Sequence, residues 1–180
     1  MPADSAFLPS RRSWQAWTTL AARLILGITL LVAGGLKLPN LEESVFAVRA
    51  YQLLPFEVTR PIGYALPIIE VALGLMLVTG TFTRLAAVAG AAMMAIFVAG
   101  IASVWARGIS IDCGCFGGGG AVDNGFALYP WEIARDVGLL LAGAWAAWRP
   151  TSLLAVDRWL LGPTATERMP DLIPQTEESV

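Results

Sequence analysis

The residues of this chain that could do chemistry gather around its two cysteines, Cys113 and Cys115. The single residue between them is Gly114, which lets the backbone fold tightly enough for the two sulfur atoms to meet. A disulfide between residues so close together closes almost no loop, so it would stabilise the fold little, and its strained ring would be easily reduced. The spacing therefore favours thiol–disulfide exchange, with one cysteine as nucleophile and the other as resolving thiol in an order that the sequence leaves open.

Two other readings of the cysteines stay open. Two thiolates could bind a soft metal ion such as Cu(I), or both cysteines could be inert loop residues. The chain has no histidine, which removes the commonest metal ligand and the commonest general base. Two thiolates without histidine make a weak case for a closed zinc site, so we assign no metal ligands from the sequence.

Several charged residues lie within or beside apolar stretches, where they are costly and often functional. We expect Glu70 to pair with Arg135, with Lys37 as an alternative partner for Glu70. Asp136 is expected to point away from Arg135, because adjacent residues on a helix do not face each other. Arg23 lies near a helix end and is expected to extend to the membrane surface. The charges could form a structural ion pair, or a proton or anion site beneath the cysteine loop.

The composition places these residues in a membrane. Of 180 residues, 56% are hydrophobic and only 14% are charged, and the mean hydropathy is +0.64. A soluble chain of this length has too little interior for so much apolar surface. The same numbers exclude a disordered chain, a basic nucleic-acid-binding protein and a disulfide-dense scaffold.

Four apolar stretches are long enough to cross a bilayer as helices, and they predict an all-α integral membrane protein built as an antiparallel four-helix bundle. They cover residues 14–36, 61–80, 85–106 and 131–148. Small residues spaced by three or four positions mark the faces that we expect to pack. These stripes are Gly63, Pro67, Glu70 and Gly74; Ala87, Ala91, Ala95, Ala99 and Ser103; and Arg135, Gly138, Ala142 and Ala146.

The flanking basic residues predict an orientation in the cell membrane with both termini in the cytoplasm and the cysteine loop outside. The predicted inner side holds Arg11, Arg12, Arg84, Arg149, Arg158 and Arg168; the outer side holds Lys37, Arg49, Arg60 and Arg107.

The remaining segments complete the predicted organisation. We expect a cytoplasmic N-terminal segment (1–13), one membrane domain (14–148) and a cytoplasmic tail (149–180). Shorter features are a surface helix at 41–53, a flexible or tightly turned loop at 113–126, an amphipathic helix at 153–161 and a disordered end at 162–180.

Over residues 16–148 the chain resembles the methylamine-utilisation MauE group, which is related to DoxX-type membrane proteins. The resemblance rests on the run Cys113-Gly114-Cys115-Phe116-Gly117 after the third span. It also covers Lys37, the Leu53-Leu54-Pro55 segment, Glu70 and Arg135. It implies a role in the maturation of extracytoplasmic redox proteins, and the DoxX relatives imply sulfur-compound oxidation coupled to quinone.

Together these points predict a membrane protein that presents an outward dithiol to a thioredoxin-like protein or a cysteine-containing client. It would be a thiol–disulfide oxidoreductase or an accessory subunit of one, with quinone as a candidate cofactor, the lipid bilayer as surroundings and no nucleic-acid partner. Two alternatives remain. One is a non-catalytic assembly subunit or scaffold with structural or metal-holding cysteines, and the other is a quinone-coupled subunit of the DoxX type.

Overall fold

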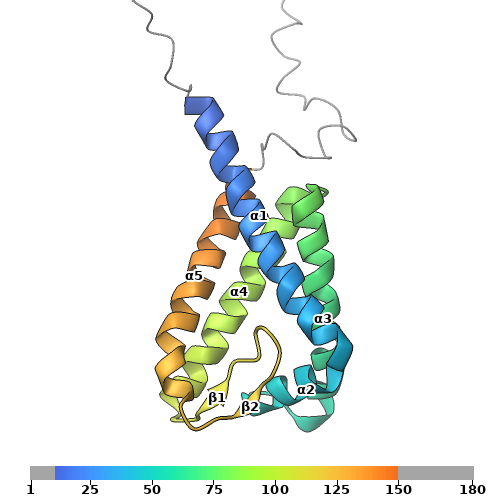
Figure 1. Ribbon diagram of the computed structural model, residues 1–180, viewed down its shortest axis with the longest axis vertical. Helices are drawn as coiled ribbons and strands as arrows, with labels where there is room; N and C mark the ends of the chain where they lie inside the picture. Colours follow the sequence, from blue (N-terminus) through green and yellow to red (C-terminus); the bar gives the residue numbers. More distant parts are fainter. Residues whose placement is uncertain (1–10, 150–180) are drawn as a thin grey trace, which may run out of the picture.

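The computed structural model describes residues 11–149, which form a bundle of helices with a small hairpin at one end (Figure 1). The elements, in chain order, are α1 (Arg11–Lys37), the short 3-10 helix η1 (Leu38–Asn40), α2 (Leu41–Ala50), α3 (Phe56–Thr79), α4 (Thr83–Ala106) and α5 (Gly125–Trp148). The long helices alternate in direction, so the α3–α4 junction lies at one end of the bundle, and α2 and the segment before α5 lie at the other (Figure 1).

A short antiparallel hairpin interrupts the otherwise helical fold, which the sequence predicted to be all-α. Strand β1 (Ile111–Asp112) pairs with β2 (Gly120–Ala121), so that Ile111 lies opposite Ala121 and Asp112 opposite Gly120. The two cysteines lie in the turn between the strands. The loop predicted as flexible or tightly turned is therefore a tight turn closed by paired backbone.

Three segments of the described chain have the length and apolar composition needed to cross a membrane, and these are Trp14–Ala50, Phe56–Thr79 and Thr83–Ala106. Helix α5 is 24 residues long, as are α3 and α4, but it carries three charged residues, Glu132, Arg135 and Asp136, in its first half. The described chain thus contains four helices of membrane-spanning length, while the crossings themselves stay predictions.

The close contact between α1 and α3 depends on glycine. A Cβ added to Gly34 would lie 2.8 Å from the Pro67 carbonyl oxygen, and one added to Gly74 would lie 2.8 Å from the Gly27 carbonyl oxygen. Side chains at these points would push the helices apart. The stripe predicted on α3, from Gly63 through Pro67 and Glu70 to Gly74, is buried throughout and is confirmed.

The stripes predicted on α4 and α5 are wrong in part. Ala95 and Ala99 of α4 are exposed, and Gly138 of α5 faces open space. A strict four-residue spacing advances about 40° around an α-helix at each step, so a run of five such positions leaves the packed face. The buried residues instead mix spacings of three and four: Ala86, Ala87, Gly90, Met93 and Met94 on α4, and Glu132, Asp136, Leu139, Gly143 and Ala146 on α5.

The packed faces enclose a core, and the outward faces remain strongly apolar. Leu26, Leu30, Leu77 and Met94 form its centre, whereas outward residues such as Ile96 and Leu141 are more than 60% exposed. An outer surface of this kind is suited to lipid rather than to water.

Three further expectations can be compared with the structure. The surface helix predicted at 41–53 is present as α2 but ends at Ala50. Arg23, expected to extend to the membrane surface, is instead buried, with 1% of its side chain exposed. The helix predicted at 153–161 and the tail predicted at 162–180 lie outside the described residues.

Candidate functional site

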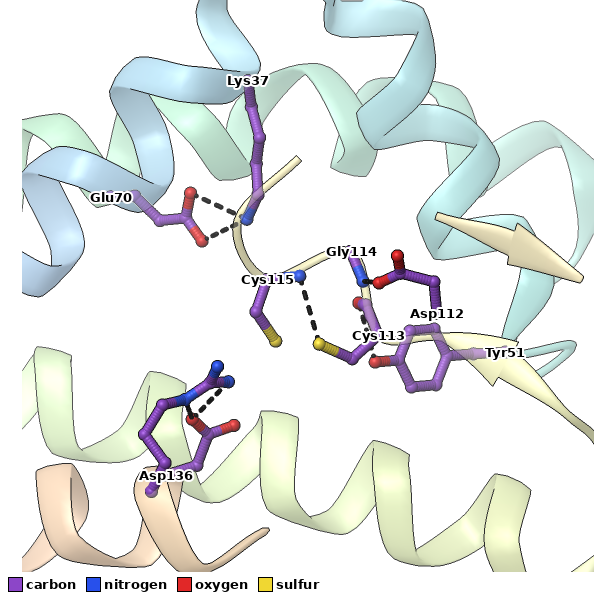
Figure 2. Close-up of polar contacts among 9 residues, drawn as sticks. Lys37, Tyr51, Glu70, Asp112, Cys113, Gly114, Cys115 and Asp136 are labelled. Carbon is purple, nitrogen blue, oxygen red and sulfur yellow. Dashed lines mark hydrogen bonds and ion pairs between the residues drawn. The ribbon is translucent and has the colours of Figure 1, made fainter. Parts of the chain in front are cut away.

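The two cysteines lie at the hairpin end of the bundle, in a turn that reaches inward between the helices (Figure 2). Both are free thiols, with 8% of Cys113 and 6% of Cys115 exposed. They pack in an apolar cluster with Ile101, Val104 and Tyr129. The backbone N–H of Cys115 donates a hydrogen bond to the Cys113 sulfur over 3.3 Å, so this short segment holds its two sulfur-bearing residues together.

Hydrogen bonds from outside the turn fix its position. The Tyr51 hydroxyl donates to the Cys113 carbonyl oxygen over 3.0 Å, and the Gly114 N–H donates to Asp112 Oδ1 over 2.9 Å. The buried Tyr129 hydroxyl donates to the Ile109 carbonyl oxygen and accepts from the Ile111 N–H, each over 2.8 Å. The loop therefore has a defined shape before any partner binds.

Two glycines let this loop lie directly on α2. Gly114 has φ +67° and Gly119 has φ +118°, conformations that other residues rarely adopt. A Cβ added at either position would lie 2.5 Å from the Cβ of Ala47. The glycines and the small Ala47 side chain are thus jointly required for the loop to dock.

The predicted pairing of Glu70 with Arg135 is wrong, and the alternative partner Lys37 takes its place. Lys37 Nζ lies 2.8 Å from one Glu70 carboxylate oxygen and 3.0 Å from the other, and both side chains are buried (Figure 2). The reason is geometric. Lys37 is the last residue of α1, which packs closely against the face of α3 that carries Glu70. Arg135 instead lies on α5 and pairs with a nearer carboxylate.

That nearer carboxylate is Asp136, which was expected to point away from Arg135. Arg135 Nε lies 2.9 Å from Asp136 Oδ1, and its terminal nitrogen lies 2.8 Å from the same oxygen. Adjacent helical residues do leave the helix in different directions, but the long arginine side chain can turn back to its neighbour. The Arg135 guanidinium also lies over the Phe116 ring, 4.8 Å from its centroid, next to the cysteine segment.

A small cavity joins these features. Thr29, Glu70, Cys115, Arg135 and Asp136 line its polar part, next to the Phe116 ring. Apolar residues of three helices complete the wall: Leu30, Ala33, Met94, Phe97 and Leu139. The volume of the cavity that the centre of a water molecule can occupy is about 10 Å³, which is about what one water molecule needs. Of the sequence-predicted site residues, Cys115, Glu70, Arg135 and Asp136 meet at this cavity. Lys37 reaches it only through Glu70, and Cys113 is not part of its wall.

Burial and neighbouring groups keep two side chains of this region, Cys115 and Tyr51, neutral. The neighbouring Cys113 thiol, together with burial, raises the pKa of the Cys115 thiol well above its ordinary value. Burial likewise raises the pKa of the Tyr51 hydroxyl. Both groups are therefore protonated at neutral pH, which suits Tyr51 to its role as a hydrogen-bond donor.

Three residues of the site were missed from the sequence. Tyr51 and Tyr129 hold the loop, and Glu132 lies beside Cys113 with one carboxylate oxygen buried and without a hydrogen-bond partner. The available signals were weak. Glu132 lies three residues before Arg135 on the same helix, and both tyrosines lie outside the cysteine motif.

Comparisons with known proteins were consistent with one another. The sequence model of a family described as methylamine utilisation protein MauE matches residues 15–149. The methylamine utilization protein MauE of Paracoccus denitrificans is 37% identical over 100 residues, which is 55% of this chain and 54% of that protein. The protein of the same name from Methylorubrum extorquens is 34% identical over 131 residues, which is 72% of this chain and 68% of that protein. The first match thus spans about half the length of its relative, and no solved structure matches the chain.

Proposed function

This chain belongs to the methylamine utilisation protein MauE family, and we propose that it supports methylamine utilisation as a membrane protein that exchanges disulfides with an extracytoplasmic partner. The observation that carries this proposal is the cysteine turn. It holds two free thiols, separated by one glycine, in a fixed loop at the end of a helical bundle. Such a pair contributes little as a staple, because the loop it could close is so short.

We assign Cys113 as the attacking thiol and Cys115 as the resolving one. Cys113 follows the partly exposed Asp112, whereas Cys115 lines the internal cavity. The Cys113 thiolate attacks a disulfide of a thioredoxin-like partner, forming a mixed disulfide and releasing one partner thiol. Cys115 then attacks the Cys113 sulfur, which forms the Cys113–Cys115 disulfide and releases the second partner thiol. Two electrons pass to the partner, and the reverse sequence gives a disulfide to a client.

The proposal includes the orientation of the protein in the membrane. All four long helices cross the bilayer, with both termini in the cytoplasm and the hairpin end outside. The basic residues of the sequence favour this arrangement by six to four, with Arg158 and Arg168, which lie outside the described residues, counted on the inner side. The exposed apolar surface of the helices supports burial in lipid.

A quinone does not fit the cavity beside Cys115, because that cavity has space for about one water molecule. The electrons in this proposal therefore pass to the thioredoxin-like partner.

Trapping of the mixed disulfide tests the exchange. In Cys115→Ser the Cys113 thiol lacks its resolving partner, so we expect an adduct to accumulate on non-reducing gels and to disappear after reduction. Cys113→Ser should give little adduct, and the double variant is the control for unrelated bands. Absence of an adduct from both single variants, with methylamine utilisation retained, would refute the exchange mechanism.

One observation supports a second candidate, a non-catalytic assembly subunit. Both sulfur atoms are almost fully buried in an apolar cluster, as structural cysteines often are. In that case Cys113→Ser and Cys115→Ser would lower the amount of folded protein without changing any thiol state of a client. Free-thiol labelling before and after exposure to a partner disulfide separates the two candidates, because only an exchanging pair becomes protected.

A further inference from the structure

Around Cys113 the structure brings together a mixed set of ligand atoms. A carboxylate oxygen of Asp112, the sulfur of Cys113 and a carboxylate oxygen of Glu132 all lie within 4.8 Å of one another. Asp112 and Cys113 come from the hairpin, whereas Glu132 comes from the second turn of α5. Among the described residues, this is the one group of three or more such side chains that are close enough to share a metal ion.

A second observation comes from the hydrogen bonds of Glu132. This side chain is only 9% exposed, and its Oε2 atom is fully enclosed without a hydrogen-bond partner. A buried carboxylate oxygen without a donor is unfavourable, and the Asp112 carboxylate close by adds repulsion. A bound cation would remove both penalties at once.

We propose that Asp112, Cys113 and Glu132 form an open binding site for a divalent ion of the zinc type. Zinc takes sulfur at about 2.3 Å and carboxylate oxygen at about 2.0–2.2 Å, so ligand atoms around one ion are at most about 4.5 Å apart. Small side-chain rotations would bring the three atoms into that range.

The donor set also selects the kind of ion. A thiolate disfavours calcium and magnesium, and two carboxylate donors disfavour Cu(I), which leaves a borderline ion such as zinc. The Cys113 thiol proton leaves to water when the ion binds. The partly exposed Asp112 gives the ion a way in from the hairpin end, and a water molecule would complete the coordination.

This site shares Cys113 with the dithiol, but Cys115 does not belong to the group. The Cys115 side chain instead lines the cavity with Arg135 and Asp136. The proposal therefore differs from a two-thiolate site in a measurable way: it needs Cys113 and Glu132 but not Cys115. It also does not depend on the proposed exchange reaction, which needs both cysteines and no metal.

Binding of Co²⁺ to the purified, reduced full-length protein in detergent tests the site. A thiolate ligand gives Co²⁺ a charge-transfer absorption in the near ultraviolet, and added Zn²⁺ should displace it. We expect this absorption in the parent protein and in Cys115→Ser, and none in Cys113→Ser. Glu132→Gln and Asp112→Asn should each weaken Co²⁺ affinity by roughly tenfold or more.

The controls address folding and non-specific binding. Asn at position 112 keeps an oxygen to accept the Gly114 N–H, so Asp112→Asn preserves the loop and gives an answer even if Glu132→Gln folds poorly. Glu43→Gln changes an exposed carboxylate and should leave affinity unchanged. No thiolate–cobalt absorption in the parent protein, or an absorption that needs Cys115 but neither carboxylate, would overturn the proposal.

Discussion

Lys37 and Glu70, 33 residues apart in the chain, form a bidentate ion pair inside the bundle, with 3% and 0% of their side chains exposed. The pair joins the end of α1 to the middle of α3. It lies beside the cavity that Cys115 lines, since Glu70 is part of the same wall. A buried pair of this kind fixes the register of two helices, and loss of one partner leaves a charge stranded in an apolar interior.

The first prediction concerns this pair. Lys37→Met and Glu70→Gln should each lower the free energy of unfolding by about 3–5 kcal/mol, because each removes the compensation of a buried group. The double variant should lose clearly less than the sum. Thermal unfolding of the four proteins in detergent measures the coupling. Additive losses would mean that the two residues do not interact.

A matched control for that cycle is the exposed pair of Arg60 and Glu42, whose side chains are 63% and 53% exposed and 3.4 Å apart. Arg60→Met and Glu42→Gln should show a coupling of no more than about 1 kcal/mol, because solvent screens the charges.

The second prediction concerns two adjacent glycines of α1. Gly34→Ala should destabilise the protein by about 1–3 kcal/mol, because the new methyl group would lie 2.8–2.9 Å from Pro67, Glu70 and Val71 of α3. Gly35→Ala meets no atom within 4 Å and should be neutral or stabilising by up to about 1 kcal/mol. Unfolding temperatures of both variants in the same detergent provide the measurement. Equal effects would mean that α1 and α3 are not in close contact at Gly34.

The third prediction concerns the docking of the cysteine loop on α2. Gly114 and Gly108 have nearly the same backbone conformation, with φ +67° and +70°, so alanine at either site carries a similar strain. Only the methyl group at position 114 would meet Ala47, at 2.5 Å, whereas position 108 is open. Maleimide labelling of Cys113 and Cys115 should therefore become several-fold faster in Gly114→Ala and stay near the parent rate in Gly108→Ala. Equal rates in the two variants would show that contact with α2 does not hold the loop.

The fourth prediction compares the two tyrosines that hold the loop. Tyr129→Phe removes the hydroxyl that donates to the Ile109 carbonyl oxygen and accepts from the Ile111 N–H, each over 2.8 Å. It therefore leaves two backbone groups without a hydrogen-bond partner. Tyr51→Phe strands only the Cys113 carbonyl oxygen. Each stranded group costs about 1–3 kcal/mol, so Tyr129→Phe should be the more destabilising change in thermal unfolding. Tyr64→Phe, which removes only solvent-exposed hydrogen bonds with Glu42 and Arg60, is the control. The reverse order would contradict the hydrogen-bond assignment.

The fifth prediction tests the orientation. In a Cys113→Ser, Cys115→Ser background, Val122→Cys in the hairpin end should react with a membrane-impermeant maleimide on intact cells. Thr81→Cys, at the α3–α4 junction, should react only after the membrane is opened. The opposite pattern would place the cysteine loop in the cytoplasm and remove the basis for an extracytoplasmic partner.

The sequence alone determined the features that depend on composition and local spacing. Long apolar stretches separated by charged or proline-containing segments require helices of membrane-spanning length. The reason is that the polar backbone groups have no water to bind in lipid and must form their hydrogen bonds internally. The position of the cysteines in one tight turn followed from the Cys-Gly-Cys spacing and the glycines after it. The buried stripe of α3 followed from Gly63, Pro67 and Gly74, whose small or rigid side chains mark a packed face.

The tertiary structure decided which charges meet and which faces of α4 and α5 are buried. Glu70 could reach either Lys37 or Arg135 by sequence reasoning, and only the close approach of α1 to α3 selects Lys37. Spacing rules describe the direction in which a side chain leaves a helix, but not the position of the charged end of a long side chain. They therefore did not predict the ion pair between Arg135 and Asp136. The convergence of Glu132 on Asp112 and Cys113 likewise depends on how α5 packs against the hairpin, which local spacing does not specify.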